Sequence, residues 1–245
     1  HAFNTAPKGA VHDAAEPLLR ALDEPYLLRS WPTKVRFNPK SAQLQTLTGH
    51  SGAVMSVSIT PDGRLAVSGG GFWDYVVRVW DLATGQCLRM LTGHSDDVNS
   101  VTITPDGMLV VSGSKDGFIR VWDVITGQCQ RTLAAAAAVS SVSVTPNGLR
   151  IVAGNRDGTV QLWDLTGAQC QLTLTGHEYA VDSVTLTPDG LLAVSAGSDG
   201  VLVWNLGSDQ SQRMYRLFDG CVRGISISVD GHHVVAGCHD KTVQV

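Results

Sequence analysis

The sequence predicts an all-β fold in which one four-stranded unit of about 40 residues occurs about five times. Two regularities predict it. A tryptophan followed by aspartate or asparagine returns at steps of 42, 41 and 41 residues, at Trp80, Trp122, Trp163 and Trp204. A Pro-Asp-Gly or Pro-Asn-Gly turn returns in the same rhythm, at Pro61, Pro105, Pro146 and Pro188. Short strands between turns at this period are typical of the blades of a β-propeller.

The clearest copy runs from Leu91 to Gln130 and justifies four strands in order. Val98 to Ile103 alternates apolar and polar residues, which predicts the first strand. A Pro-Asp-Gly turn separates it from a second apolar run, Met108 to Ser112, and a glycine separates that run from a third strand, Phe118 to Trp122. A Thr-Gly turn then leads into the outer strand, Cys129 to Leu133.

Five copies fill the chain from residue 43 onward, with bounds near 43–86, 87–128, 129–169, 170–210 and 211–245. Three of them depart from the common pattern. The first has SGGGFWD (Ser68 to Asp74) where the second has SGSKD (Ser112 to Asp116), an insertion of two residues. The third has five alanines, Ala134 to Ala138, and the fifth stops at Val245, where the next residue would align with the tryptophan.

Gly-His precedes the first strand at His50, His94 and His177. Gly-His early in a repeat and Trp-Asp near its end make Gln43 to Val245 resemble the WD-repeat (WD40) β-propeller family. The resemblance implies about five four-stranded blades. Rings of this family most often have seven blades, so the resemblance implies that these blades belong to a larger seven-blade ring. A closed ring of five is the alternative, and an open ring would expose its end blades and self-associate.

The segment Gln43 to Leu47 matches the outer strand of later copies, although it precedes any complete blade. By analogy with the family, we expect it to pair with the last blade, which would remove two exposed strand edges. Residues 1–42 match no repeat. Acidic residues before prolines, at Glu16-Pro17 and Glu24-Pro25, predict short helical turns in a linker. Because the chain starts at His1 and ends inside an expected strand, we expect it to be a piece of a longer protein.

A histidine, a serine, an aspartate and the tryptophan align in three copies and suggest a serine hydrolase. An active site needs one pocket and not three, so repetition of the set opposes catalysis. In the WD-repeat family, such residues resemble a structural hydrogen-bond network, which implies no catalytic residue. Its members here are His50, Ser68, Asp74, Trp80; His94, Ser112, Asp116, Trp122; His177, Ser195, Asp199, Trp204; and, without histidine or serine, Asp157 and Trp163.

The composition excludes several classes of partner. The net charge is −4 and 16% of the residues are charged, so no basic face for nucleic acid is expected. No apolar run approaches the roughly 20 residues of a membrane helix, and no signal peptide is present. We therefore expect a soluble, cytoplasmic protein. The five cysteines have no metal spacing, so we expect neither a metal site nor a cofactor.

Function is therefore expected on the surface, at the end of the blades where the turns before the first strands meet those between the second and third strands. We expect a protein or peptide to bind there, because aromatic and arginine side chains are enriched at binding hot spots. The candidate residues are Phe72, Trp73, Asp96, Asp97, Lys115, Arg156, Glu178, Tyr179 and His239.

The chain is interpreted as a non-catalytic protein–protein interaction propeller, the ligand-sensing or docking region of a larger multidomain signalling protein. Its repeats resemble those of large prokaryotic WD-repeat proteins, and the linker before the first blade loosely resembles the junction in signalling NTPases where an ATPase and a helical domain precede WD repeats. A stand-alone scaffold propeller that assembles several protein partners is the first alternative, and a propeller hydrolase is the second.

Overall fold

The computed structural model describes residues 45–207, 214–218 and 220–245, so the helical turns predicted within residues 1–42 lie outside the described part. The described residues form strands and turns and no helix, which confirms the all-β prediction. Accordingly, the described part of the chain holds no helix that could cross a membrane. The blades lie within one unit, Leu47–Val245.

Nineteen strands make up this unit. Their bounds are β1 Val54–Ile59, β2 Leu65–Gly70, β3 Val77–Asp81, β4 Cys87–Leu91, β5 Val98–Ile103, β6 Leu109–Ser114, β7 Phe118–Asp123, β8 Cys129–Ala134, β9 Val139–Val144, β10 Arg150–Asn155, β11 Val160–Asp164, β12 Cys170–Leu174, β13 Val181–Leu186, β14 Leu192–Gly197, β15 Gly200–Asn205, β16 Met214–Phe218, β17 Val222–Ile227, β18 Val234–Cys238 and β19 Val243–Gln244.

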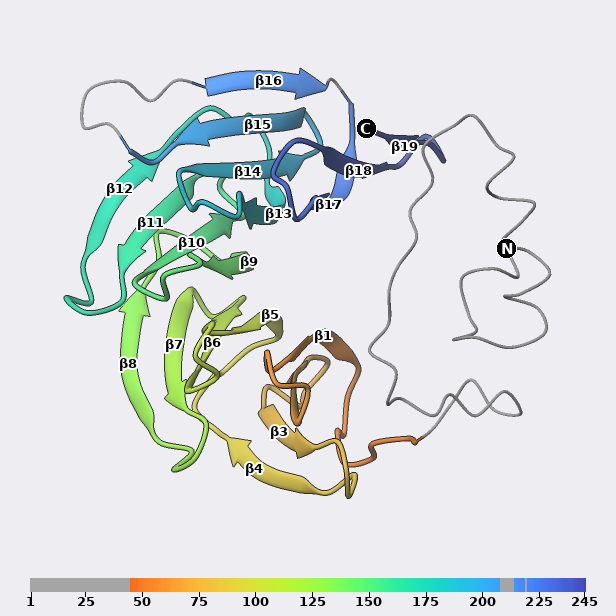
Figure 1. The fold of residues 1–245 in the computed structure, drawn as a ribbon, viewed down its shortest axis with the longest axis vertical. Helices are drawn as coiled ribbons and strands as arrows, with labels where there is room; N and C mark the ends of the chain where they lie inside the picture. Colours follow the sequence, from red (N-terminus) through yellow and green to blue (C-terminus); the bar gives the residue numbers. More distant parts are fainter. Residues whose placement is uncertain (1–44, 208–213, 219) are drawn as a thin grey trace. The chain divides into compact units, whose positions relative to one another are not determined.

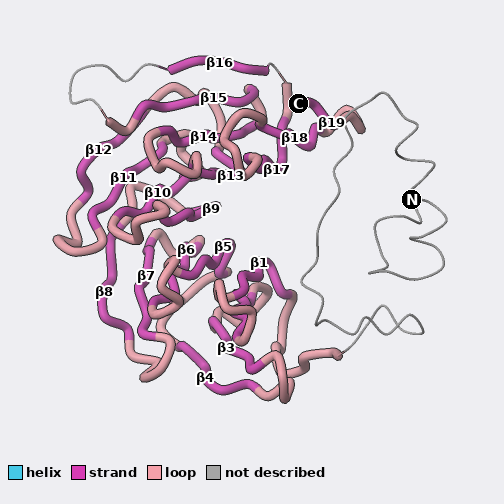
Figure 2. The backbone as a smooth tube through the Cα atoms, in the orientation of Figure 1, coloured by secondary structure: helices cyan, strands magenta, loops and turns pink. Residues whose placement is uncertain are grey.

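The strands pair in chain order into five antiparallel sheets, which we number blade 1 to blade 5. Blades 1 to 4 have four strands each, and blade 5 has three, β17 to β19. Successive first strands contact one another in the order β1, β5, β9, β13, β17. Figure 1 shows these strands on the inner side of the array and β4, β8, β12 and β16 on its outer side. The same view coloured by secondary structure shows loops and turns joining the successive strands from β1 to β15 (Figure 2).

The Thr-Pro-Asp-Gly turns fix the connection between the first and second strands. In blade 2, the Thr104 hydroxyl donates to Asp106 Oδ1 at 2.5 Å, and the Leu109 N–H donates to Thr104 Oγ1 at 3.0 Å. This threonine bond lowers the pKa of the Asp106 carboxyl. Gly107 follows at φ 73°, a left-handed conformation that glycine adopts without a steric penalty. The repeated Pro-Asp-Gly signal therefore corresponds to a turn with its own hydrogen bonds.

The apolar core lies between blades. Each blade has a trailing face, which packs on the next blade, and a leading face, which packs on the blade before it. The trailing face of blade 1 (Val67, Val77, Val79, Leu91) packs with the leading face of blade 2 (Val98, Val101, Ile103, Val110, Trp122, Val124). The same pairing recurs between blades 2 and 3, 3 and 4, and 4 and 5. One interface type, used four times, builds the array.

Close approach of the blades requires glycine in the second strand. A Cβ atom built on Gly113 of β6 would lie 2.6 Å from Val139 Cγ1 and 2.8 Å from Val142 Cγ1 of blade 3. Serine side chains add polar links across the same interfaces, because Ser100 Oγ accepts a hydrogen bond from the Val142 N–H at 3.1 Å. Neighbouring first strands are thus joined by both packing and hydrogen bonds.

The leading face of blade 1 has no neighbouring blade among the described residues. Val57 and Ile59 are 69% and 59% exposed, whereas the equivalent Val101 and Ile103 of blade 2 are 5% and 9% exposed. At the other end of the array, the trailing face of blade 5 is also uncovered: Val243 is 70% exposed, whereas its equivalent Ile119 is fully buried. A closed ring of five blades is therefore not formed, and the larger ring remains a prediction.

The pairing expected between Gln43–Leu47 and the last blade is not seen with blade 5. Residues 45–50 are not in a strand, and blade 5 receives no fourth strand from the described part of the chain. Gln43 and Leu44 lie outside the described residues.

Candidate functional site

The turns of interest meet at one end of the blades, which we call the upper end. It consists of the loops before β1, β5, β9, β13 and β17 and the turns between the second and third strands of each blade. Hydrogen bonds tie the two kinds of turn together within a blade: the Lys115 N–H donates to the Asp97 carbonyl at 2.9 Å, and the Arg156 N–H to the Ala138 carbonyl at 2.9 Å. The upper end is thus a row of paired loops.

A side-chain network supports these loops in blade 2. His94 Nδ1 lies 2.8 Å from Asp116 Oδ2, and His94 Nε2 lies 2.8 Å from Ser112 Oγ. The Trp122 indole N–H donates to the same Ser112 oxygen at 2.8 Å. Asp116 also accepts the backbone N–H of Ser95 at 3.1 Å, which fastens the loop before β5 to the turn after β6. The network joins the buried Trp122 of the third strand to the upper-end loops.

The same four residue types lie together in blades 1 and 4. Trp80 donates to Ser68 Oγ at 2.7 Å and Trp204 to Ser195 Oγ at 2.7 Å. In each case the serine also contacts a histidine, which in turn contacts the aspartate: His50 with Asp74, and His177 with Asp199. Three copies of one arrangement, each within its own blade, give a supporting framework.

Electrostatics of the network favour an ionised aspartate. Burial raises the pKa of Asp116, but the hydrogen bond and positive charge of His94 and the N–H groups of Ser95 and Phe118 outweigh it and lower this pKa to about 2. The pKa of Asp199 is also lowered, because the Glu178 N–H and His177 together outweigh burial. At neutral pH both aspartates are therefore ionised. As carboxylates they bind backbone N–H groups of the upper-end loops.

Blade 3 lacks this framework. Asp157 is exposed and its Oδ1 accepts from the Thr159 N–H at 3.0 Å, so it belongs to a turn and not to a histidine network. Ala153 stands where blade 2 has Ser112, and the buried Trp163 indole N–H has no hydrogen-bond partner. The buried Asn155 donates its amide to Gln161 Oε1 at 3.1 Å, which partly replaces the missing network.

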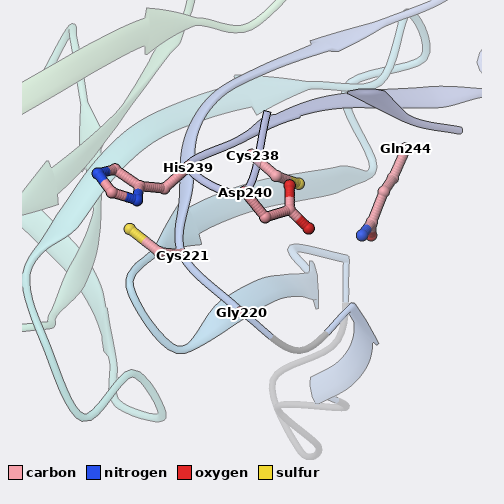
Figure 3. A pocket seen from close by; sticks show the side chains of 6 residues that line it. All are labelled: Gly220, Cys221, Cys238, His239, Asp240 and Gln244. Atoms are coloured by element: carbon pink, nitrogen blue, oxygen red, sulfur yellow. The ribbon is translucent and has the colours of Figure 1, made fainter. Parts of the chain in front are cut away.

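Blade 5 contains a cavity where the network would be. It measures about 220 Å³ and is lined by Gly220, Cys221, Cys238, His239, Asp240 and Gln244, from the loop before β17, the end of β18 and its following turn, and β19 (Figure 3). Asp240 aligns with Asp116, but it binds the Thr242 N–H at 3.0 Å, and no histidine reaches it among the described residues. Nowhere in the described part of the chain do three His, Cys, Asp or Glu side chains form a metal site.

The turn between β2 and β3 differs from every other turn at the upper end. Phe72, Trp73 and Tyr75 have φ values of 54°, 80° and 46°. Side chains rarely adopt this left-handed region, and each such residue costs about 1–3 kcal/mol. Phe72 is 63% and Trp73 86% exposed. Exposed aromatic rings on a strained backbone mark this turn as the strongest candidate for contact with a partner.

The remaining upper-end candidates are distributed over four blades. Lys115 Nζ lies 3.6 Å from Asp96 Oδ1, so these two charges pair within blade 2. Asp97 is half-buried and reaches toward blade 1, where its Oδ1 accepts the Phe72 N–H at 2.7 Å. Arg156 in blade 3, Glu178 and Tyr179 in blade 4 and His239 in blade 5 are exposed. The structure thus brings Phe72, Trp73 and Asp97 together, and places the others separately along the row.

The opposite end carries an apolar surface that sequence analysis missed. Met108, Leu149 and Leu191 follow the turn glycine in three successive blades and are 60%, 51% and 55% exposed. Ile125 lies at the same end and is 72% exposed. Alignment of the repeats could have found this surface, because the three residues occupy one position of the repeat.

Comparison with known proteins agrees with this architecture. The family described as "WD domain, G-beta repeat" matches five segments, residues 41–81, 85–123, 127–164, 168–205 and 212–245, which are most of the chain. Each match ends at or beside the Trp-Asp position of a blade.

Three relatives illustrate the similarity. The chain is 39% identical to the small ribosomal subunit protein RACK1z of Arabidopsis thaliana over 24% of each chain. It is 39% identical to a ribosome biogenesis protein BOP1 homolog of Caenorhabditis elegans, over 34% of this chain and 11% of that protein. It is 35% identical to the eukaryotic translation initiation factor 3 subunit I of Scheffersomyces stipitis, over 21% of this chain and 14% of that protein. The matched segments span a quarter or less of these relatives.

Proposed function

Because the chain belongs to the WD domain, G-beta repeat family, we propose that it is a non-catalytic platform that binds protein or peptide partners at the upper end of its blades. The names of the relatives support a place in assemblies, since two are called a ribosomal subunit protein and a subunit of an initiation factor. The observation that carries the proposal is the turn at Phe72 and Trp73, where the first blade departs from the repeat and exposes two aromatic rings.

The geometry of the histidine network opposes a hydrolase. Ser112 and Ser195 are fully buried and Ser68 is 5% exposed, so a substrate carbonyl has no path to these hydroxyls. Each of these oxygens already accepts an indole N–H. A nucleophilic serine must instead be reachable by the substrate and free to transfer its proton to the histidine. A supporting role for the network fits both facts.

We also propose, as the wider setting, that the platform is the ligand-sensing or docking region of a larger cytoplasmic signalling protein of the NTPase type. Its support is the close similarity of successive repeats. The alternative is a stand-alone scaffold that assembles several partners. Sequencing the gene upstream distinguishes the two, because a phosphate-binding GxxxxGK[ST] motif there supports the first and its absence from the complete gene supports the second.

Affinity capture from the source cell tests the platform. Phe72→Ala/Trp73→Ala alters the upper end, and Met108→Ala/Leu149→Ala is a control that removes two exposed apolar side chains at the opposite end. We expect the first variant to lose at least one partner that the wild type and the control retain. Identical captures by wild type and the upper-end variant would overturn the proposal, as would a loss confined to the control variant.

A further inference from the structure

We propose that Trp73, Phe72 and Asp97 form a recognition site for a cationic side chain, lysine or arginine, presented by a peptide partner. The inference rests on the proposed function and specifies the chemistry of the partner. Its elements come from two adjacent blades, since the aromatic residues lie in the turn after β2 and Asp97 in the loop before β5.

The aromatic side of the site is open to solvent. Trp73 is 86% exposed, and its ring centroid lies 6.4 Å from that of Tyr75 with the planes tilted by 46°. Phe72 is 63% exposed and lies next to Trp73 in the turn. Cations are attracted to the faces of aromatic rings, most strongly to tryptophan, within about 6 Å of the ring centroid. The Trp73 indole therefore offers a face that a cation can approach.

A carboxylate is bound to the backbone of the same turn. Asp97 Oδ1 accepts the Phe72 backbone N–H at 2.7 Å, which fixes its distance from the aromatic turn. The side chain of Lys115, whose backbone N–H binds the Asp97 carbonyl, pairs with Asp96 instead, at 3.6 Å. No basic side chain among the described residues forms an ion pair with Asp97. A cation from outside the chain would meet both a ring face and an unneutralised carboxylate.

The backbone of the turn is held in place. The Gly71 N–H donates to the Ala53 carbonyl at 2.8 Å, and the Gly70 N–H to the Val76 carbonyl at 3.0 Å. Gly71 itself allows close packing, because a Cβ atom there would lie 2.8 Å from Met55 Cγ and 3.2 Å from Asp97 Oδ1. A fixed backbone reduces the entropy lost on binding. The strained left-handed residues are thus oriented before a partner arrives.

These features favour a cation over other side chains. An apolar side chain gains most in an enclosed pocket, and these rings are mostly exposed. An acidic side chain would be repelled by Asp97. A lysine or arginine gains from the ring faces and the carboxylate together, while its aliphatic part covers apolar surface. The two-residue insertion gives this turn two exposed aromatic side chains in succession, Phe72 and Trp73.

The indole N–H signal of Trp73 provides a direct readout. Trp80, Trp122, Trp163 and Trp204 are buried, so their signals report folding, whereas the Trp73 signal reports the site. We would titrate ¹⁵N-labelled protein with four capped heptapeptides, Gly-Ser-Gly-X-Gly-Ser-Gly, in which X is Arg, Lys, Gln or Glu. The Trp73 signal is assigned by its disappearance in Trp73→Phe.

We expect the Arg and Lys peptides to shift the Trp73 signal in a saturable manner at low salt and the Gln and Glu peptides to leave it in place. Asp97→Asn should weaken Arg-peptide binding at least severalfold and reduce its dependence on salt. Asp106→Asn, which removes a carboxylate at the opposite end of blade 2 and gives that turn the residue that blade 3 has at Asn147, should leave binding unchanged. Preserved signals of the four buried tryptophans show that each variant remains folded.

Equal shifts by the Arg and Gln peptides, or no shift by any peptide at millimolar concentration, would overturn the inference. If the capture experiment shows that partners depend on Phe72 and Trp73 while Arg and Gln peptides behave alike, the platform stands and only its cation specificity fails. If partners do not depend on the upper end, the proposed function itself fails. The two readouts therefore separate the two claims.

Discussion

Exchanging serine and alanine at one repeat position tests the role of the buried network. Ser112→Ala gives blade 2 the residue that blade 3 has naturally at Ala153, and Ala153→Ser gives blade 3 the serine of blade 2. Ser112 Oγ lies 2.8 Å from both Trp122 Nε1 and His94 Nε2 and is fully buried. Its removal leaves two buried polar groups without their partner.

The structure sets the expected magnitudes. An unsatisfied buried group costs about 1–3 kcal/mol, so Ser112→Ala should lower the free energy of unfolding by about 2–4 kcal/mol. Ala153→Ser supplies an acceptor to the Trp163 indole N–H, which has none. A net hydrogen bond contributes about 0.5–1.5 kcal/mol, so this variant should be more stable than the wild type by about that amount.

Both changes can be measured by urea unfolding. Hydrogen exchange is followed separately in β6–β7 and in β10–β11. We expect faster exchange in β6–β7 for Ser112→Ala and slower exchange in β10–β11 for Ala153→Ser. Ser143→Ala, a serine of β9 outside the network, is the control and should change stability by less than about 0.5 kcal/mol. A neutral Ser112→Ala, or an Ala153→Ser that destabilises blade 3, would refute the reasoning.

Three further predictions concern pH, packing and self-association. Because the pKa of Asp116 is lowered from 3.8 to about 2, its contribution to stability is complete above pH 3.8 and is lost as the pH falls toward 2. Acid titration of the unfolding free energy should therefore show a loss of at most about 2 kcal/mol. Asp116→Asn should abolish this loss. Gly113→Ala should destabilise the protein by about 1–3 kcal/mol in urea, since the added methyl meets Val139; an unchanged midpoint would contradict the packing described. The wild type should self-associate through its uncovered end faces, and Val57→Asp should raise the dissociation constant measured by sedimentation velocity about tenfold or more, whereas a monomeric wild type would contradict it.

The repeat pattern predicted the blades because each strand, turn and core position recurs with the same side-chain chemistry. The four strands of blade 2, expected from alternation and turn residues, form with boundaries that differ by a residue or two. The chain order of histidine, serine, aspartate and tryptophan was enough to anticipate that they meet. Blade 3 shows the limit, because Asp157 keeps its place in the sequence and its turn bond to Thr159, but has no histidine to bind.

Other features depend on the backbone and could not be predicted from residue types. Nothing in the sequence around Phe72 and Trp73 specifies left-handed backbone angles, which arise from fitting two extra residues between strands whose register is fixed. The contact of Asp97 with the Phe72 N–H joins two blades and has no local signal. Gln43–Leu47 matches an outer strand in sequence, yet residues 45–50 are not in a strand, because a residue pattern alone supplies no partner strand.

The place of blade 3 in the array has a consequence for cooperativity. Blades touch only their neighbours, so the array behaves as a one-dimensional chain of coupled units. Blades 3 and 5 both lack a histidine network, and blade 3 lies at the centre, where it shares one core with blade 2 and another with blade 4. Fluctuations that open the centre would leave two folded halves joined by a hinge. The upper-end loops of blades 1 and 4 could then change their separation while each half keeps its structure, so that a partner spanning both would sense, and set, the angle between the halves.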